Sequence, residues 1–248
     1  MKLTVIGCSG SVPGPDSPAS AYLVSADGFH LMLDFGSGSL GVLQRHIGVH
    51  EVGAIGLSHL HPDHCMDLCG LYVATKYSPA APFPRIPVYG PGGTADRMAQ
   101  AYNLPLDPGM NEQLDFRDWQ PEQRIGPFTV RTTRVAHPVP AYAIRVEYDG
   151  RSLVYSGDTG PTEALVELSR GADVLLCEAA LDDGDPDNPP DLHLTGSQAG
   201  DHARKAGVSK LIVTHVPPWF DRPTQVRDAA KTFSGEIIAA EPDASYEI

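Results

Sequence analysis

The chain has 248 residues, of which 42% are hydrophobic, enough for a large core in a single domain spanning residues 1–248. No apolar stretch approaches the roughly 20 residues of a membrane span, and the N-terminus has no charged-then-apolar leader, so we expect a cytoplasmic protein without membrane contact. The net charge of −13, from 31 acidic and 18 basic residues, repels polyanions and makes nucleic acid an unfavourable partner.

Short apolar runs alternate with helical segments along the chain. The predicted strands cover residues 3–6, 21–24, 31–33, 54–57, 128–135, 143–146, 153–155, 174–176 and 211–213. Two proline-rich stretches, residues 78–91 and 182–190, are predicted to be loops that border the functional site. The pattern therefore indicates an α/β protein with mixed sheets.

Two helices have clear start and stop signals. Residues 160–171 carry a proline near the first position, Glu in the first turn, Arg in the last and Gly beyond. Thr195 and Gln198 form a capping-box pattern that opens a helix, and Gly207 ends it. Both helices follow predicted strands, as expected for an α/β fold.

A dense group of chemically active residues follows the strand at 54–57. Its members are His59, His61, Asp63 and His64. Alternation in an extended backbone places the first two on one side, and Pro62 then bends the chain so that the last two return toward the same point. Imidazole and carboxylate together suit zinc, manganese or iron. The alternative is a polar turn whose histidines lie in solvent.

Three more candidate ligands stand at later strand ends. His137, Asp158 and His215 each follow a predicted strand directly. Each by itself is compatible with a structural role, since Asp commonly begins turns. Together with the first group they make five histidines and two aspartates, enough for two divalent ions that share one carboxylate and keep open positions.

The pattern His-x-His-x-Asp-His followed by separate His, Asp and His resembles the metallo-β-lactamase superfamily over nearly the whole chain. That resemblance implies an αββα sandwich and two metal ions, with zinc the first candidate and manganese or iron the alternatives. It assigns His59, His61 and His137 to one ion, Asp63, His64 and His215 to the other, and Asp158 to both. It also implies that Asp34 supports the ligand loop from behind.

Within the superfamily, residues 178–180 and 191–195 are similar to the ribonuclease Z-like phosphodiesterases. The resemblance implies that His193 donates a proton to the leaving group, that Glu178 orients it, and that Asp63 accepts a proton from the attacking water. Without this resemblance, His193 would be read as an exposed loop residue. Scattered segments resemble actinobacterial cyclic-nucleotide phosphodiesterases more narrowly; they lie at residues 7–11, 14–20, 43–46, 64–68 and 214–219.

These features predict a metal-dependent phosphodiesterase that cleaves 3′,5′-cyclic nucleotides, cyclic AMP first, to the 5′-monophosphate. The alternatives are a tRNA 3′-endonuclease, another small-molecule phosphodiesterase, or a metal-bound scaffold without turnover. Only 20 residues separate His137 from Asp158, where one branch of tRNA-processing relatives carries a protruding arm, so a small phosphodiester is favoured over RNA. Whether the chain forms a homodimer is left open.

Two further features allow more than one interpretation. The four cysteines, Cys8, Cys65, Cys69 and Cys177, show no paired framework and are interpreted as small buried hydrophobes in preference to a metal or redox site. The small residues 7–11 after the first strand either cradle a phosphate with free amides or form a plain turn.

Overall fold

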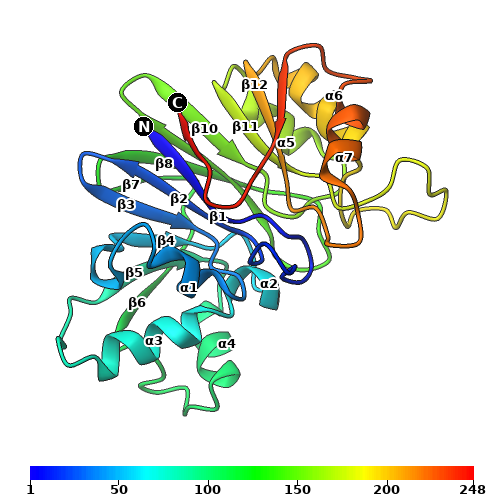
Figure 1. Ribbon diagram of the computed structural model, residues 1–248. Helices are drawn as coiled ribbons and strands as arrows, with labels where there is room; N and C mark the ends of the chain where they lie inside the picture. The colour runs from blue at the N-terminus through cyan, green and yellow to red at the C-terminus, as the bar shows by residue number, and fades with distance from the viewer.

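The computed structural model describes residues 1–248 as fourteen strands, seven α-helices and one short 3-10 helix (Figure 1). The strands are β1 (Lys2–Gly7), β2 (Ala21–Ala26), β3 (Phe29–Leu33), β4 (Ala54–Gly56), β5 (Ile86–Gly90), β6 (Leu114–Asp118), β7 (Glu122–Ile125), β8 (Phe128–Arg134), β9 (Tyr142–Tyr148), β10 (Arg151–Tyr155), β11 (Val174–Glu178), β12 (Lys210–Thr214), β13 (Glu236–Ala239) and β14 (Ser245–Glu247). The helices are α1 (Ser39–Leu43), η1 (Val49–Glu51), α2 (Pro62–Cys65), α3 (Leu68–Tyr77), α4 (Thr94–Ala101), α5 (Glu163–Ser169), α6 (Gly196–Ala206) and α7 (Arg222–Ala229).

The strands form two seven-stranded sheets. The first has the order β14-β1-β2-β3-β4-β5-β6 and the second the order β13-β12-β11-β10-β9-β8-β7. Strands β3 to β6 run parallel, as do β10 to β13, so each sheet has a block of strands whose carboxyl ends meet at one edge. The last strand returns to pair antiparallel with β1, which brings the two ends of the chain close together (Figure 1).

Three hydrophobic clusters separate four layers. One cluster lies between the two sheets, and one lies on the outer face of each sheet beneath its helices. In Figure 1, α3 and α4 cover the first sheet and α5, α6 and α7 cover the second. The order helix, sheet, sheet, helix confirms the predicted αββα sandwich.

Side chains on the buried strands alternate between these clusters. On β3, Leu31 and Leu33 enter the core between the sheets, whereas Met32 packs beneath the helices of the first sheet. On β10, Leu153 lies between the sheets and Val154 faces the helices of the second. Because both faces of each sheet are covered, these strands read as continuous apolar runs.

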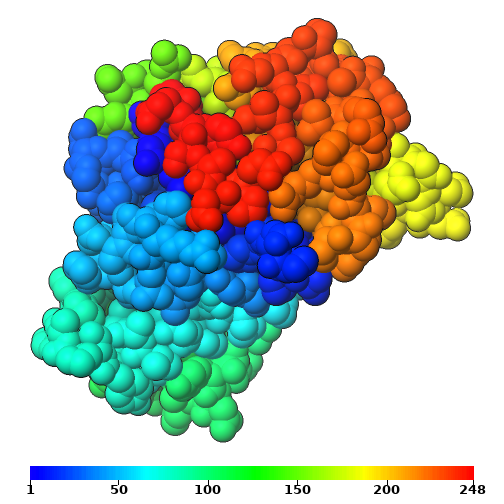
Figure 2. Space-filling view, in the orientation of Figure 1, coloured from blue at the N-terminus to red at the C-terminus, as the bar shows by residue number.

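The structure confirms most of the predicted elements and corrects one. The predicted loop at 78–91 contains the strand β5, whose residues Val88 to Gly90 are buried beside β4. The segment 182–190 is a loop as predicted, and it projects from the body of the molecule (yellow in Figure 2). The capping box of α6 forms, with Thr195 and Gln198 bonding each other's backbone N–H groups.

Two smaller expectations concern burial. Three of the four cysteines are buried, Cys69 is half-buried, and all four are free thiols, which fits their interpretation as packing residues. None of the seven helices combines the length and the apolar character that crossing a bilayer requires.

Candidate active site

The predicted ligands meet where the carboxyl ends of strands from both sheets come together. His59 follows β4, Asp158 follows β10 and His215 follows β12. The Tyr142 N–H donates to the Ser58 carbonyl at 3.0 Å, which joins the ligand loop of the first sheet to a strand of the second. The site is therefore built on the ends of buried strands, where packing holds loops in place.

The side chains form three overlapping groups whose ligand atoms lie within 4.8 Å of one another. The first cluster is His59, His61, His137 and Asp158; the second cluster is Asp63, His64, His215 and Asp158; the third group is Asp158, Glu178 and His193. All nine site residues predicted from the sequence belong to these groups, and Asp158 belongs to all three. The clusters are able to bind metal ions.

Distances within the clusters suit metal ligands. In the first cluster, His61 Nδ1 lies 3.0 Å from His59 Nε2 and 3.2 Å from His137 Nε2. In the second, His64 Nε2 is 3.2 Å from Asp158 Oδ2, and His215 Nε2 is 3.4 Å from Asp158 Oδ1. The two oxygens of Asp158 thus face different histidines.

Three atoms in the second cluster are buried without a hydrogen-bond partner. They are His64 Nε2, His215 Nε2 and Asp158 Oδ1. Leaving a buried polar atom unpaired costs about 1–3 kcal/mol, and three such atoms converging on one point require a common partner. A divalent cation is the partner that imidazole nitrogen and carboxylate oxygen share.

Hydrogen bonds behind the ligands fix which ring nitrogen faces the cluster. Four outer nitrogens have a protein partner: His59 Nδ1 with Ser58 Oγ (3.0 Å), His64 Nδ1 with Asp34 Oδ2 (2.7 Å), His137 Nδ1 with the Leu192 carbonyl (2.9 Å) and His215 Nδ1 with Ser20 Oγ (2.7 Å). A proton on the outer nitrogen leaves the lone pair of Nε2 for a metal. His61 differs, because its Nδ1 faces the cluster and its Nε2 has no partner in the protein.

Asp34 supports the ligand loop, as the resemblance implies. Its carboxylate is fully buried and accepts hydrogen bonds from His64 Nδ1, the Ser58 N–H and hydroxyl, and the Tyr155 hydroxyl at 2.6–2.7 Å. Asp34 has φ of 58° and His215 has φ of 52°, a left-handed conformation that is uncommon outside glycine. The local strain is held by the surrounding packing at the site where the ligands are aimed.

Two glycines allow the early loops to pack directly against ligand-bearing backbone. A Cβ at Gly36 would lie 2.0 Å from the Asp63 carbonyl oxygen, and one at Gly10 would lie 2.3 Å from the His215 carbonyl oxygen. Neither backbone oxygen can move without moving its ligand. Any side chain at these positions would therefore displace the loop that carries a ligand.

The charges of the site are strongly coupled. Burial alone would raise the pKa of Asp158, but the imidazoles around it, His215 and His64 foremost, hold that pKa well below its usual value. Burial would lower the pKa of His64, but the carboxylates of Asp158 and Asp34 on either side of the ring raise it well above its usual value. The Asp158 carboxylate is thus ionised and ready to bind a cation.

Glu178 and His193 form a separate pair at the edge of the clusters. His193 Nδ1 lies 2.9 Å from Glu178 Oε1, and the fully buried Glu178 also accepts from the Thr159, Ala180 and Leu194 N–H groups. Burial lowers the pKa of His193, but the Glu178 carboxylate outweighs it and raises the pKa to about 9. Because Nδ1 is bound to Glu178, Nε2 is the nitrogen that can deliver a proton.

The supporting residues Ser20, Tyr155 and Leu192 were not predicted. Each lies far along the chain from the group it supports: Ser20 and His215 are 195 positions apart. No local motif marks such contacts. In the turn at residues 7–11, the N–H groups of Cys8, Ser9 and Gly10 donate within the protein, so these three amides are not free to bind a phosphate.

Comparisons with known proteins agree with this geometry. The family model for the beta-lactamase superfamily domain matches residues 39–216, which include all the clustered ligands. The chain belongs to the metallo-β-lactamase superfamily. It is 44% identical to an uncharacterized protein of Mycobacterium leprae, over the full chain and 89% of that protein.

Two further members of the superfamily bear on the chemistry. The probable metallo-hydrolase YhfI of Bacillus subtilis is 28% identical over the full length of both chains, and its crystal structure superposes with a TM-score of 0.87 over 99% of both. Ribonuclease Z of Mycobacterium bovis is 32% identical over 96% of this chain and 94% of its own. The chain is therefore a metallo-hydrolase of this superfamily.

Proposed function

We propose that the protein is a phosphodiesterase for small substrates, with 3′,5′-cyclic nucleotides favoured and cyclic AMP first among them. The product would be the 5′-monophosphate. The observation that carries the proposal is the Glu178–His193 pair beside two clusters of metal ligands. Phosphodiester cleavage expels an alkoxide, which needs a proton donor on the side away from the nucleophile.

The residues that would hold the metals divide by cluster. His59, His61 and His137 would hold one divalent ion, Asp63, His64 and His215 the other, and Asp158 would contact both. Zinc is the first candidate for this mixture of nitrogen and oxygen, with manganese or iron as alternatives. When bound, such ions supply a nucleophile at neutral pH by lowering the pKa of water, and they neutralise charge on phosphoryl oxygens.

The protein's own groups would then move the protons. Asp63 Oδ2 lies 3.3 Å from His64 Nε2 and 3.8 Å from His215 Nε2. Burial would raise the pKa of Asp63, but the neighbouring His64 outweighs burial and lowers it, so the carboxylate is ionised. In that form Asp63 would be the acceptor for a proton of the attacking water. His193 would donate its Nε2 proton to the leaving oxygen while Glu178 holds the ring. A bound cation near the ring would lower the pKa of His193 from about 9 toward neutrality, where a general acid is most effective.

Two features support a small substrate. The chain between His137 and Asp158 folds as the antiparallel pair β9 and β10 with a turn at Asp149 and Gly150, which leaves no residues for a protruding arm. The net charge of −13 repels a large polyanion at long range, whereas a small anion responds mainly to cations at the site.

The second candidate is a tRNA 3′-endonuclease, which the similarity to ribonuclease Z of Mycobacterium bovis favours. Purified protein loaded with zinc, manganese or iron should be assayed against cyclic AMP, other cyclic nucleotides, linear diesters and a tRNA precursor. We expect the highest kcat/KM for a cyclic nucleotide. A kcat/KM for the tRNA precursor well above that for cyclic AMP would overturn the proposal.

A further inference from the structure

A cavity of about 340 Å³ adjoins the first cluster at His61. Its apolar walls come from Leu60 on the loop after β4, from Pro62 at the start of α2, and from Val139 and Pro140 on the loop after β8. The volume lies in the range of small-molecule sites, which combine apolar walls with a few polar groups. A substrate whose phosphate lies at the clusters could therefore extend its non-reacting part into this cavity.

Arg97 on α4 supplies the cavity with a cation that has no partner. The side chain is half-buried, and its guanidinium forms no ion pair and no hydrogen bond with any group of the protein. This is unusual in a chain with 31 acidic and 18 basic residues. No carboxylate lines the cavity, so the five N–H donors of Arg97 are available to a ligand.

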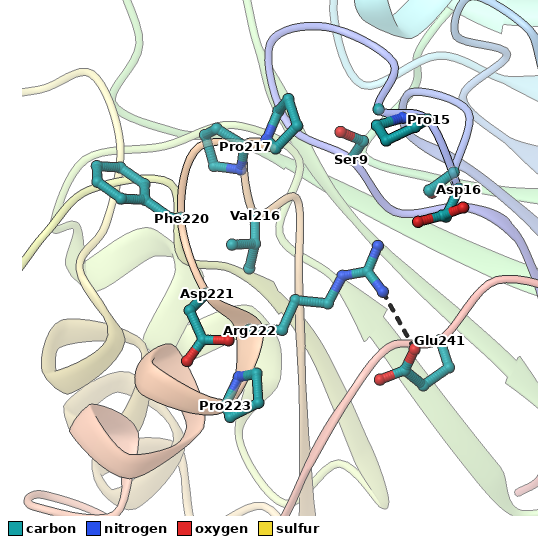
Figure 3. A pocket seen from close by; sticks show the side chains of 13 residues that line it. Ser9, Pro15, Asp16, Val216, Pro217, Phe220, Asp221, Arg222, Pro223 and Glu241 are labelled. Carbon is teal, nitrogen blue, oxygen red and sulfur yellow. Dashed lines mark hydrogen bonds and ion pairs between the residues drawn. The ribbon is translucent and has the colours of Figure 1, made fainter.

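A second cavity shows the opposite arrangement (Figure 3). It measures about 320 Å³ and contains Arg222, whose guanidinium is 3.1 Å from a carboxylate oxygen of Glu241. Asp16 and Asp221 also line it, which makes its surroundings acidic. Arg222 is thus already neutralised by Glu241, whereas the guanidinium of Arg97 has no carboxylate partner.

His61 also lines the cavity and would give it a second donor if its Nδ1 held a metal ion. Its Nδ1 faces His59 and His137, and its Nε2 has no partner in the protein. A histidine that uses Nδ1 as a ligand carries its proton on Nε2. The cavity thus combines apolar walls with donors and lacks acidic side chains, which suits a flat ring with acceptor atoms on its edge.

We infer, on the basis of the proposed phosphodiesterase function, that this cavity binds the nucleobase of the substrate and that Arg97 is its main polar contact. The guanidinium donates to acceptor atoms on the edge of the base or stacks on its face, while the four apolar side chains exclude water from the ring. Arg97 is accordingly a residue that determines specificity and does not take part in the chemical step.

The test compares two esters with the same leaving group in the metal-loaded full-length protein. One is the p-nitrophenyl ester of thymidine 5′-phosphate, and the other is methyl p-nitrophenyl phosphate, which has no base. Arg97→Ala should lower kcat/KM about 10- to 100-fold for the nucleoside ester, mainly through KM, and about twofold or less for the methyl ester. Arg222→Ala, which removes an arginine from the other cavity, should change neither.

Equal losses on both esters, or none on either, would overturn the inference. Binding provides an independent readout: by calorimetry, Arg97→Ala should weaken 5′-AMP about tenfold or more and leave inorganic phosphate unchanged. A wild-type protein that binds 5′-AMP no better than phosphate would also contradict it. If cyclic AMP is not cleaved but Arg97→Ala still discriminates the two esters, the substrate proposal fails and the base site stands.

Discussion

The first and second clusters share Asp158 but differ in how they meet solvent. In the second cluster His64 and His215 are fully buried and braced by Asp34 and Ser20, whereas His61 and His137 of the first are half-buried at the mouth of the site. An ion in the second cluster would satisfy atoms that otherwise lie unpaired in the core. We therefore expect the second cluster to retain its ion more strongly than the first.

Replacing the shared carboxylate of Asp158 should have the largest effect, because it belongs to both clusters. Asp158→Asn keeps the shape of the side chain but removes the charge that both clusters use, so metal content should fall below two ions per chain. Activity should fall by about 10⁴-fold, since metal catalysis contributes several kcal/mol. Metal analysis and kcat/KM check both effects. Two retained ions with near-normal activity would show that Asp158 does not bridge the clusters.

His193 touches the clusters only at their edge, so its removal should separate chemistry from metal binding. We expect His193→Ala to lower kcat about 10²–10⁴-fold with unchanged metal content. The general acid must be protonated, so the activity of the wild-type protein should fall as the pH rises through the pKa of His193. The pH–activity profile of the variant should not show this fall. The nitrophenyl group leaves without the help of a proton donor, so the loss of kcat in His193→Ala should be smaller for a nitrophenyl ester. Loss of metal from the variant would make His193 a ligand instead.

Asp34 tests whether the second cluster depends on its support. Asp34→Asn weakens the hydrogen bond to His64 and should reduce affinity for one ion about 10- to 100-fold, while the other ion is retained. Asp173→Asn is the matched control, because Asp173 also accepts from the backbone and hydroxyl of a serine, Ser152, but lies away from the site. Titration with a competing chelator measures both variants. An equal loss of metal affinity in Asp34→Asn and Asp173→Asn would show that Asp34 has no special role in supporting the second cluster.

Thermal unfolding compares the two clusters directly. An ion present at 1,000 times its Kd stabilises the fold by about 4 kcal/mol, so chelation should lower Tm by about 8–16 °C. The effect should survive in His61→Ala, which leaves the second cluster intact. If chelation no longer shifts the Tm of this variant, the stabilising ion is held by the first cluster and not by the second.

The sequence predicts the residues of the site more completely than it predicts the strands and the contacts that support the site. Most of the ligand candidates stand just after the ends of apolar strands, and Asp63 and His64 lie on α2 a few residues further on, so the local pattern locates them. The fold class follows from the family resemblance. The sequence predicts a loop where β5 forms, because prolines surround this strand and Pro87 lies within it. The burial of β5 comes from its pairing with β4 and β6. The partners of His215 and His137 depend on contacts between distant segments, which no local pattern reveals.

The close approach of Gly10 and Gly36 to ligand-bearing backbone has a consequence for how this site can evolve or be redesigned. Those two positions tolerate only glycine, because any added atom would push on the His215 or Asp63 carbonyl oxygen. The side chains that form the walls of the neighbouring cavity, such as Leu60 and Val139, are not held to glycine by such a close backbone contact. Selection can therefore change which molecule enters without disturbing how the metals are held, so libraries for new substrates should vary the walls and keep both glycines.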